Sequence, residues 1–124
     1  SLRSGTLRIR IFGIDAPELN QECKDQNGGI WGCGIAAQRQ LVALIGTKKE
    51  LQCSLRDVDR YGRLIMQCFT GSTDIGAAMV QSGHALAYRH FSDLYIADED
   101  QAKTAQKGIW RGIFVPPWEW RRNN

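Results

Sequence analysis

The 124-residue chain is long enough for one domain with a single modest core, and its 43% hydrophobic and 23% charged residues are ordinary for a globular protein. No apolar stretch is long enough to cross a membrane, which excludes a membrane-spanning helix within this sequence. The net charge of +3, with arginine at eleven of sixteen basic positions, suits an anionic partner without requiring one and favours bidentate recognition of phosphate.

The first predicted element is a strand over residues 7–12, because Leu7, Ile9 and Ile11 recur with a period of two. Arg10 alternates with these apolar residues and therefore points the other way, toward solvent or a groove. Taken alone, a solvated arginine is the favoured interpretation of Arg10.

The strand ends in a turn, DAPE, whose residues are typical of a helix start. Asp15 is a suitable N-cap, Pro17 suits the first turn, and Glu18 complements the helix dipole. The same two carboxylates, three positions apart, could also converge on one hard cation or one water. From these residues alone the helix cap is the favoured interpretation.

Residues 19–32 are predicted to form a polar loop closed by Trp31. A helix follows over 34–45, with Gly46 as its stop. Two alternating runs, 51–55 and 64–68, flank the segment VDRYGR and predict a β-hairpin. Taken alone, this segment is an ordinary charged hairpin turn.

The cysteines are spaced too widely for a CxxC pair, and neither His84 nor His90 lies near them, so zinc is not expected. Two disulfides in a secreted or periplasmic protein are favoured over free buried thiols. The residues concerned are Cys23, Cys33, Cys53 and Cys68.

The hairpin register gives a pairing for these cysteines. If residues 60–61 form a two-residue turn, facing positions sum to 121, and Cys53 and Cys68 meet that condition. Facing residues are close enough for a disulfide. Cys23 is then left to pair with Cys33.

After the hairpin, Asp74 is predicted to cap a short helix, and HALAY, residues 84–88, to form a brief strand. Ser92 is predicted to cap a further helix that runs to Lys107, with Gly108 as a left-handed stop. This order of strands and helices predicts an α+β domain over residues 1–115, with a small barrel as its sheet.

The tail, residues 116–124, is proline-broken and aromatic. It is interpreted as a packed C-terminal arm rather than a ligand platform.

Two motifs in this order, RIFGIDAPE (residues 10–18) and DRYGR (59–63), resemble the active-site motifs of the staphylococcal nuclease family. AMVQSG and KGIW resemble helix ends of that family, and the insertion ECKDQNGGIWGCG is similar to its exported bacterial branch. The resemblance covers nearly the whole chain. It implies a five-stranded oligonucleotide-binding barrel with three helices and a calcium-dependent phosphodiesterase activity.

Position by position, the resemblance makes Arg10 and Arg63 phosphate clamps and Glu18 the general base. It makes Asp15 a calcium ligand, with the backbone carbonyl of Ala16 as another and Glu18 near the metal through a water. Two guanidiniums and a divalent ion would stabilise the charge that builds on a phosphodiester under attack.

Three further residues acquire substrate contacts from the resemblance. Arg60 and Tyr61 would lie beside the phosphate of the bound nucleotide, and Tyr88 would flank its base or sugar. The expected substrates are single-stranded or frayed DNA and RNA.

The chain departs from the family pattern at its beginning. The family carries an Asp-Gly-Asp-Thr/Ser stretch before the Arg10 strand, and Ser1 aligns with the last residue of that stretch. A second acidic calcium ligand and the first barrel strand are therefore expected to be missing from this chain. Weak calcium binding and association through an open edge would follow, whereas the complete protein is expected to be a monomer.

Two functions of different classes are compatible with these motifs. One is a secreted or periplasmic, calcium-dependent nuclease acting on DNA and RNA. The other is a catalytically silent module of the same fold that binds nucleic acid or protein. Because silent relatives typically lose the arginines or the glutamate, the presence of Arg10, Glu18 and Arg63 favours the enzyme.

Overall fold

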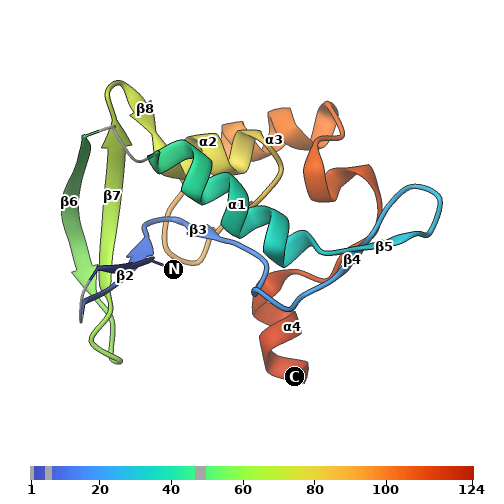
Figure 1. The fold of residues 1–124 in the computed structure, drawn as a ribbon, viewed down its shortest axis with the longest axis horizontal. Helices are drawn as coiled ribbons and strands as arrows, with labels where there is room; N and C mark the ends of the chain where they lie inside the picture. Colours follow the sequence, from blue (N-terminus) through green and yellow to red (C-terminus); the bar gives the residue numbers. More distant parts are fainter. Residues whose placement is uncertain (1, 5–6, 47–49) are drawn as a thin grey trace.

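The computed structural model describes residues 2–4, 7–46 and 50–124 and places a mixed sheet to one side of the helices (Figure 1). The predicted α+β class is confirmed. In the part of the chain so described, no helix is long and apolar enough to span a bilayer. Ser1, on which the predicted alignment with the acidic stretch depends, lies outside these residues.

The main sheet has five strands in the order β1-β2-β7-β6, with β8 also paired to β7. β2 and β7 run parallel, and the other pairs are antiparallel. Along the described strands the pairing has β1 and β6 as its two ends, so a closed barrel is not formed by these ladders. The strands are β1 (Leu2–Ser4), β2 (Leu7–Ile11), β6 (Leu51–Val58), β7 (Leu64–Thr70) and β8 (Thr73–Asp74).

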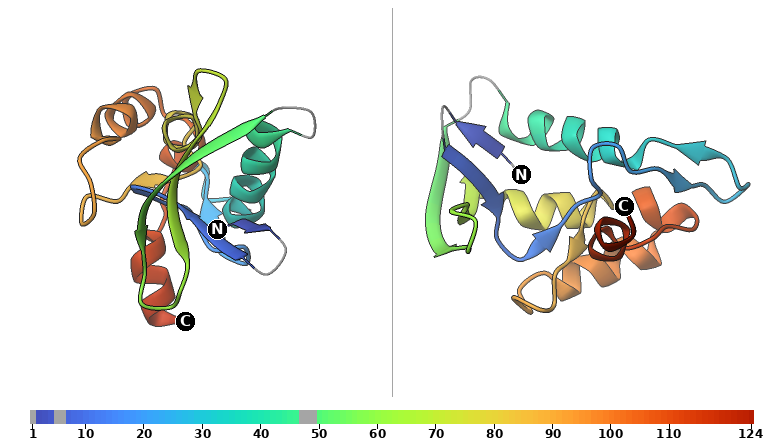
Figure 2. Two further views of the ribbon diagram at one scale, coloured as in Figure 1. Left: turned by 90° about the vertical axis from the view of Figure 1, so that its left-hand side faces the viewer. Right: turned by 90° about the horizontal axis from the view of Figure 1, so that it is seen from below.

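The helices in the described residues number four, one more than expected, because the tail also folds into a helix. They are α1 (Cys33–Ile45), α2 (Ile75–Gln81), α3 (Ile96–Thr104) and α4 (Pro117–Asn123), with a 3-10 turn, η1, over Gly108–Arg111. α2 is central and packs against β7, α1 and α3. Its residues Ile75, Met79 and Val80 lie in the main core. The left view of Figure 2 shows α4, in red, projecting from the rest of the molecule, with the C-terminus at its tip.

Asp74 caps α2 as predicted, accepting hydrogen bonds from the backbone N–H groups of Gly76 (2.9 Å) and Ala77 (3.3 Å). The prediction that Ser92 caps the next helix is wrong. The Ser92 Oγ accepts from the Leu94 N–H at 3.0 Å and closes a turn before α3 begins.

The buried side chain of Tyr95 explains why α3 begins later than predicted. Its hydroxyl donates to both carboxylate oxygens of Asp74, at 3.0 and 2.8 Å, which fixes Tyr95 at the helix entry. α3 also ends before Lys107, because Gln106 takes a positive φ of 52° that a helix cannot continue through.

The hairpin β6–β7 is confirmed, but its predicted two-residue turn is wrong. Asp59 N–H donates to Arg63 O at 3.0 Å, which encloses a three-residue turn whose last residue, Gly62, has φ +79°. A β-bulge between Leu55 and Asp57 then shifts the register back by one. The two departures cancel, so Cys53 faces Cys68 as predicted.

Both predicted disulfides are present, Cys53–Cys68 across the hairpin and Cys23–Cys33 at the start of α1. The predicted loop over 19–32 contains a short hairpin, β4 (Cys23–Lys24) with β5 (Ile30–Trp31). The second disulfide joins this hairpin to α1 inside a smaller apolar cluster with Leu86 and Ile109.

The Cys53–Cys68 bridge should contribute about 3 kcal/mol to the free energy of unfolding, because it closes a loop with a sequence separation of 15 residues. We expect the double variant Cys53→Ala with Cys68→Ala to lose that amount in urea unfolding without reductant. A loss below about 1 kcal/mol would show that the reduced chain already holds the hairpin closed.

Candidate active site

Arg10, Asp15, Glu18 and Arg63, four residues singled out from the sequence, line one cavity of about 350 Å³. They come from β2, β3 (Ile14–Asp15), the loop after β3, and the position just before β7. Tyr61 and Arg121 also line this cavity. The rest of its lining is apolar and consists of Ile11, Ile14, Ala16, Leu41 and Met79.

Asp15 lies in a strand, so its predicted role as a helix cap is wrong. β3 pairs with β9 (Leu86–Ala87), with Asp15 opposite Leu86, and residues 16–22 are not helical. Gly13, at φ +76°, makes the sharp turn between β2 and β3 possible. That turn brings Asp15 back beside Arg10, whose Nη2 lies 3.3 Å from the Asp15 Oδ1.

The Asp15 carboxylate is only 4% exposed and is held by two guanidiniums. Arg121, from α4, donates to it with two nitrogens, at 3.0 Å to Oδ1 and 2.6 Å to Oδ2. A charge so deeply buried requires this pairing, because an unpaired carboxylate would lose its hydration without compensation.

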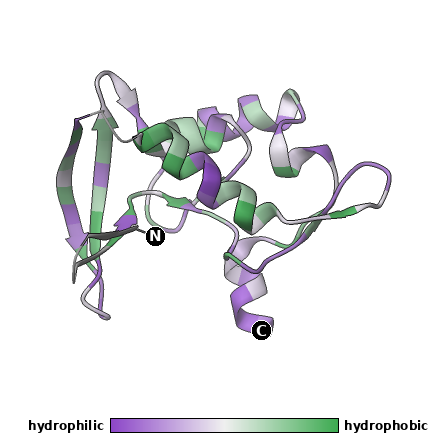
Figure 3. Cartoon of the chain, viewed as in Figure 1, coloured by the Kyte–Doolittle hydropathy of each residue, from purple (hydrophilic) through white to green (hydrophobic). Residues whose placement is uncertain are grey.

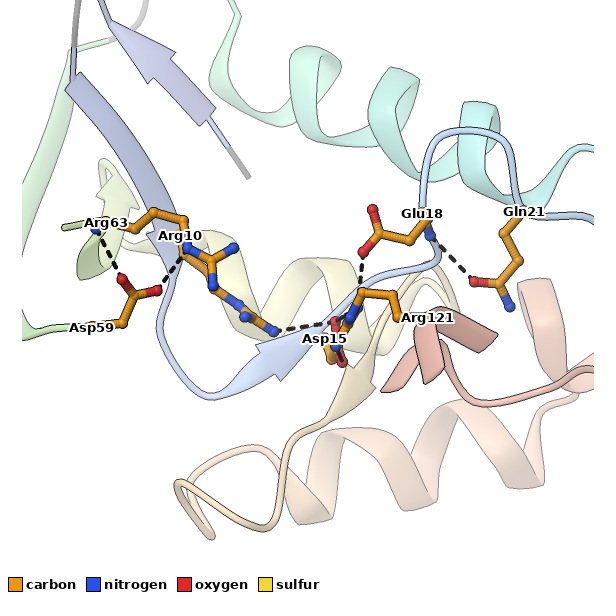
Figure 4. Close-up of polar contacts among 7 residues, drawn as sticks. All are labelled: Arg10, Asp15, Glu18, Gln21, Asp59, Arg63 and Arg121. Atoms are coloured by element: carbon orange, nitrogen blue, oxygen red, sulfur yellow. Dashed lines mark hydrogen bonds and ion pairs between the residues drawn. The ribbon is translucent and has the colours of Figure 1, made fainter. Parts of the chain in front are cut away.

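Arg121 also donates to Glu18 Oε1 at 2.9 Å, from the same nitrogen that contacts Asp15 Oδ1 (Figure 4). One guanidinium thus joins the two carboxylates. Hydrogen bonds to Asp15, and less strongly to Glu18, raise the pKa of Arg121 above its usual value despite partial burial.

Arg121 was not predicted as a site residue. Pro117 at the start of the PWEWRR segment is a helix-start signal, and a helix there places Trp118 and Arg121 on one face. Arg121 on that face contacts Asp15 and Glu18, which lie 106 and 103 positions earlier in the chain, so the local sequence does not reveal these contacts.

The loop that carries Glu18 is fixed from two sides. Gln21, which is buried, accepts from the Glu18 N–H at 3.2 Å and donates to the Val115 carbonyl at 2.8 Å, which ties the loop to the residue just before the C-terminal arm. On the other side, Gly34 of α1 lies so close that a Cβ there would clash with the Glu18 carbonyl oxygen.

Arg63 is positioned by Asp59, another residue to which the sequence assigned no role. Asp59 Oδ2 accepts from Arg63 Nε at 2.6 Å, while Oδ1 accepts from the backbone N–H groups of Tyr61 and Arg63 at 2.9 Å. Desolvation raises the pKa of the Asp59 carboxyl, but the hydrogen bonds from Arg63 and Tyr61 outweigh it and hold that pKa below its usual range.

The predicted substrate contacts Arg60, Tyr61 and Tyr88 line a second cavity, of about 550 Å³, that also includes Arg10 and Arg63. Tyr61 and Phe91 bring exposed rings to this cavity, at 58% and 55% exposure. Tyr88 stacks on Trp118 of α4, with ring centroids 5.4 Å apart and planes at 13°. The C-terminal arm therefore contacts the two carboxylates through Arg121 and the ring of Tyr88 through Trp118.

The donor set fits a hard divalent cation in kind, because Asp15 and Glu18 already converge on a single cationic group. Ala16, the predicted carbonyl donor, lines the same cavity. Across residues 2–4, 7–46 and 50–124, no three His, Cys, Asp or Glu side chains gather as a ligand cluster. Two carboxylates alone indicate a weak site.

Comparison with known proteins identifies a family for this chain. The model of the family described as "Staphylococcal nuclease homologue" matches residues 8–112. The chain is 34% identical over 131 residues to a micrococcal nuclease of Shigella flexneri, covering 94% of this chain and 69% of that protein. It is 31% identical over 106 residues to the succinoglycan biosynthesis protein ExoI of Rhizobium meliloti (strain 1021), covering 84% of this chain.

A probable staphylococcal-like nuclease of Oryza sativa subsp. japonica, CAN3, is 32% identical over 119 residues, which is 94% of this chain. The chain spans 56% of the length of ExoI and 29% of the length of CAN3. The chain thus corresponds to only part of the length of these two relatives.

The close approach of Gly34 to the Glu18 loop predicts a large effect of a single methyl group. Gly34→Ala should lower the melting temperature by several degrees, because the backbone of the loop must shift, although alanine ordinarily favours a helix. Gly32→Ala is the matched control, since its Cβ would meet Ile35 at 3.8 Å, an ordinary contact. Equal melting temperatures in the two variants, measured by circular dichroism, would contradict this account of the loop.

Proposed function

The chain belongs to the staphylococcal nuclease homologue family, and from this premise we propose that it hydrolyses phosphodiester bonds of DNA and RNA in a calcium-dependent reaction. One observation carries the proposal. Two guanidiniums, Arg10 and Arg63, and a carboxylate, Glu18, line the same cavity beside the buried Asp15. This combination of anion-binding groups and a proton acceptor is what phosphodiester hydrolysis requires.

In the proposed reaction, Arg10 and Arg63 bind the phosphate oxygens and stabilise the charge that builds on them. Arginine suits this role because its planar fork can bind two oxygens at once. The contact from Asp59 engages Arg63 at Nε, so it orients the guanidinium from its base rather than from its terminal nitrogens.

Glu18 is the proposed general base. A water attacks the phosphorus, Glu18 accepts a proton from it, and the bond from phosphorus to the leaving sugar oxygen breaks. Asp15, Glu18 and the carbonyl of Ala16 would hold calcium, which when bound supplies positive charge next to the phosphate.

Single-stranded or frayed nucleic acid is the proposed substrate. The cavity beside the carboxylates combines guanidiniums of Arg10, Arg60 and Arg63 with the rings of Tyr88 and Phe91. Basic groups that follow a backbone, with aromatic rings on which unpaired bases stack, are the usual means of binding a single strand.

We also propose that the protein acts as a monomer in a secreted or periplasmic setting. All the residues assigned to the reaction come from one chain. Both disulfides are formed, and such bonds persist in oxidising compartments.

Glu18→Gln tests the proposed base and separates the enzyme from a silent binding module of the same fold. Hydrolysis of a labelled single-stranded oligonucleotide should fall about 10²–10⁴-fold, while binding of that oligonucleotide survives. Glu22→Gln, four positions on and exposed, is the control and should keep the wild-type rate. Wild-type hydrolysis by Glu18→Gln would remove Glu18 from this role, and no hydrolysis by the wild-type protein would favour the silent module.

Arg63→Ala tests the phosphate clamp. Loss of one hydrogen-bond donor directed at the phosphate should lower the rate of hydrolysis about 10²–10³-fold. The free energy of unfolding should change little, because Arg63 lies at a partly exposed turn. Arg39→Ala, an exposed arginine on α1, removes the same charge and serves as the control. If both variants lose activity equally, only the net charge matters and the assignment is wrong.

A further inference from the structure

We propose that Arg121 is a built-in competitor of calcium, a cation of the chain itself that occupies the carboxylates until a metal ion displaces it. The proposal rests on the proposed function above, because it concerns the same two carboxylates. It makes Arg121 the residue that sets the calcium concentration at which the site fills.

The contacts of Arg121 place its charge where an ion would need to lie. Its nitrogens are 2.6, 3.0 and 2.9 Å from Asp15 Oδ2, Asp15 Oδ1 and Glu18 Oε1. Calcium binds such oxygens directly, at about 2.3–2.6 Å. An ion on the same oxygens would lie next to the guanidinium, and two like charges at that distance repel strongly in a partly buried site.

Among the residues that the structure describes, Asp15 and Glu18 are the acidic ones that line this cavity, so these offer calcium no other carboxylate there. Asp15 Oδ1 also forms an ion pair with Arg10, whose Nη2 lies 3.3 Å away. Both oxygens of the buried carboxylate are therefore already engaged by guanidiniums, so the metal must remove Arg121 to gain its ligands.

Arg121 can leave without unfolding the arm. The base of α4 is anchored by the buried Pro117, by Trp118 stacked on Tyr88, and by the hydrogen bond from Gln21 to Val115. The last turn is hydrophilic (Figure 3), and the Arg121 side chain is 34% exposed. Rotation of this one long side chain into solvent therefore frees Asp15 Oδ2 and Glu18 Oε1, while Arg10 stays beside Asp15 Oδ1.

The test compares Arg121→Gln with Arg122→Gln. Both variants remove one positive charge from the same turn of α4, but Arg122 is exposed and the contacts to the carboxylates come from Arg121. Each protein, folded and free of nucleic acid, is titrated with calcium chloride at fixed ionic strength, and the backbone amide NMR shifts near Asp15 and Glu18 give the affinity.

We expect Arg121→Gln to bind calcium on the order of 10-fold more tightly than the wild type, and Arg122→Gln to match the wild type. Equal or weaker binding by Arg121→Gln would overturn the proposal. So would the absence of saturable calcium binding in all three proteins.

Oligonucleotide hydrolysis by the wild type, measured separately with calcium and with a chelator, keeps the two hypotheses apart. If hydrolysis requires calcium but the two variants bind it equally, the competition fails and the proposed function stands. If Arg121→Gln binds calcium more tightly but the wild type hydrolyses nothing, the competition stands and the proposed function fails.

Discussion

The buried carboxylate of Asp15 is the interaction on which the rest of the site depends. Its charge lies almost out of contact with water and must be compensated by the two guanidiniums of Arg10 and Arg121. These come from a sheet strand and from the last helix, so one carboxylate joins the beginning and the end of the chain.

The backbone around Asp15 is built to keep that carboxylate in place. The turn at Gly13 and the pairing of β3 with β9 fix its direction, while Gly34 and Gln21 fix the following loop that carries Glu18. Side chains held by packing and hydrogen bonds lose little freedom when a substrate binds, which is the value of preorganisation in a catalytic site. The arm adds Arg121, whose guanidinium joins the two carboxylates of this frame.

Local patterns in the sequence were sufficient for the strand over residues 7–11, the hairpin β6–β7 and the first two helices, whereas the four residues that line the cavity were identified through the family resemblance. The local patterns worked because a period of two or 3.6 residues and a cap such as Asp74 act over short distances. The pairing of Cys53 with Cys68 was correct although the turn was not, since the bulge cancels the extra turn residue. Arg121 was missed because its partners Asp15 and Glu18 lie 106 and 103 positions earlier in the chain, a separation that no short pattern spans. Asp59 contacts residues within its own turn, so an aspartate that opens a turn two and four positions before Tyr61 and Arg63 was a local signal that went unused. The catalytic and metal roles stay predictions.

We propose that the Asp15 charge organises a calcium-dependent phosphodiesterase. The most direct test is the rate of hydrolysis of a single-stranded oligonucleotide over a calcium titration, by the wild type and by Asp15→Asn, which keeps the shape of the side chain. The account predicts a calcium-dependent rate for the wild type and a loss of about 10² or more in the variant, with cooperative unfolding retained. A variant with the wild-type rate and the wild-type calcium dependence would contradict it.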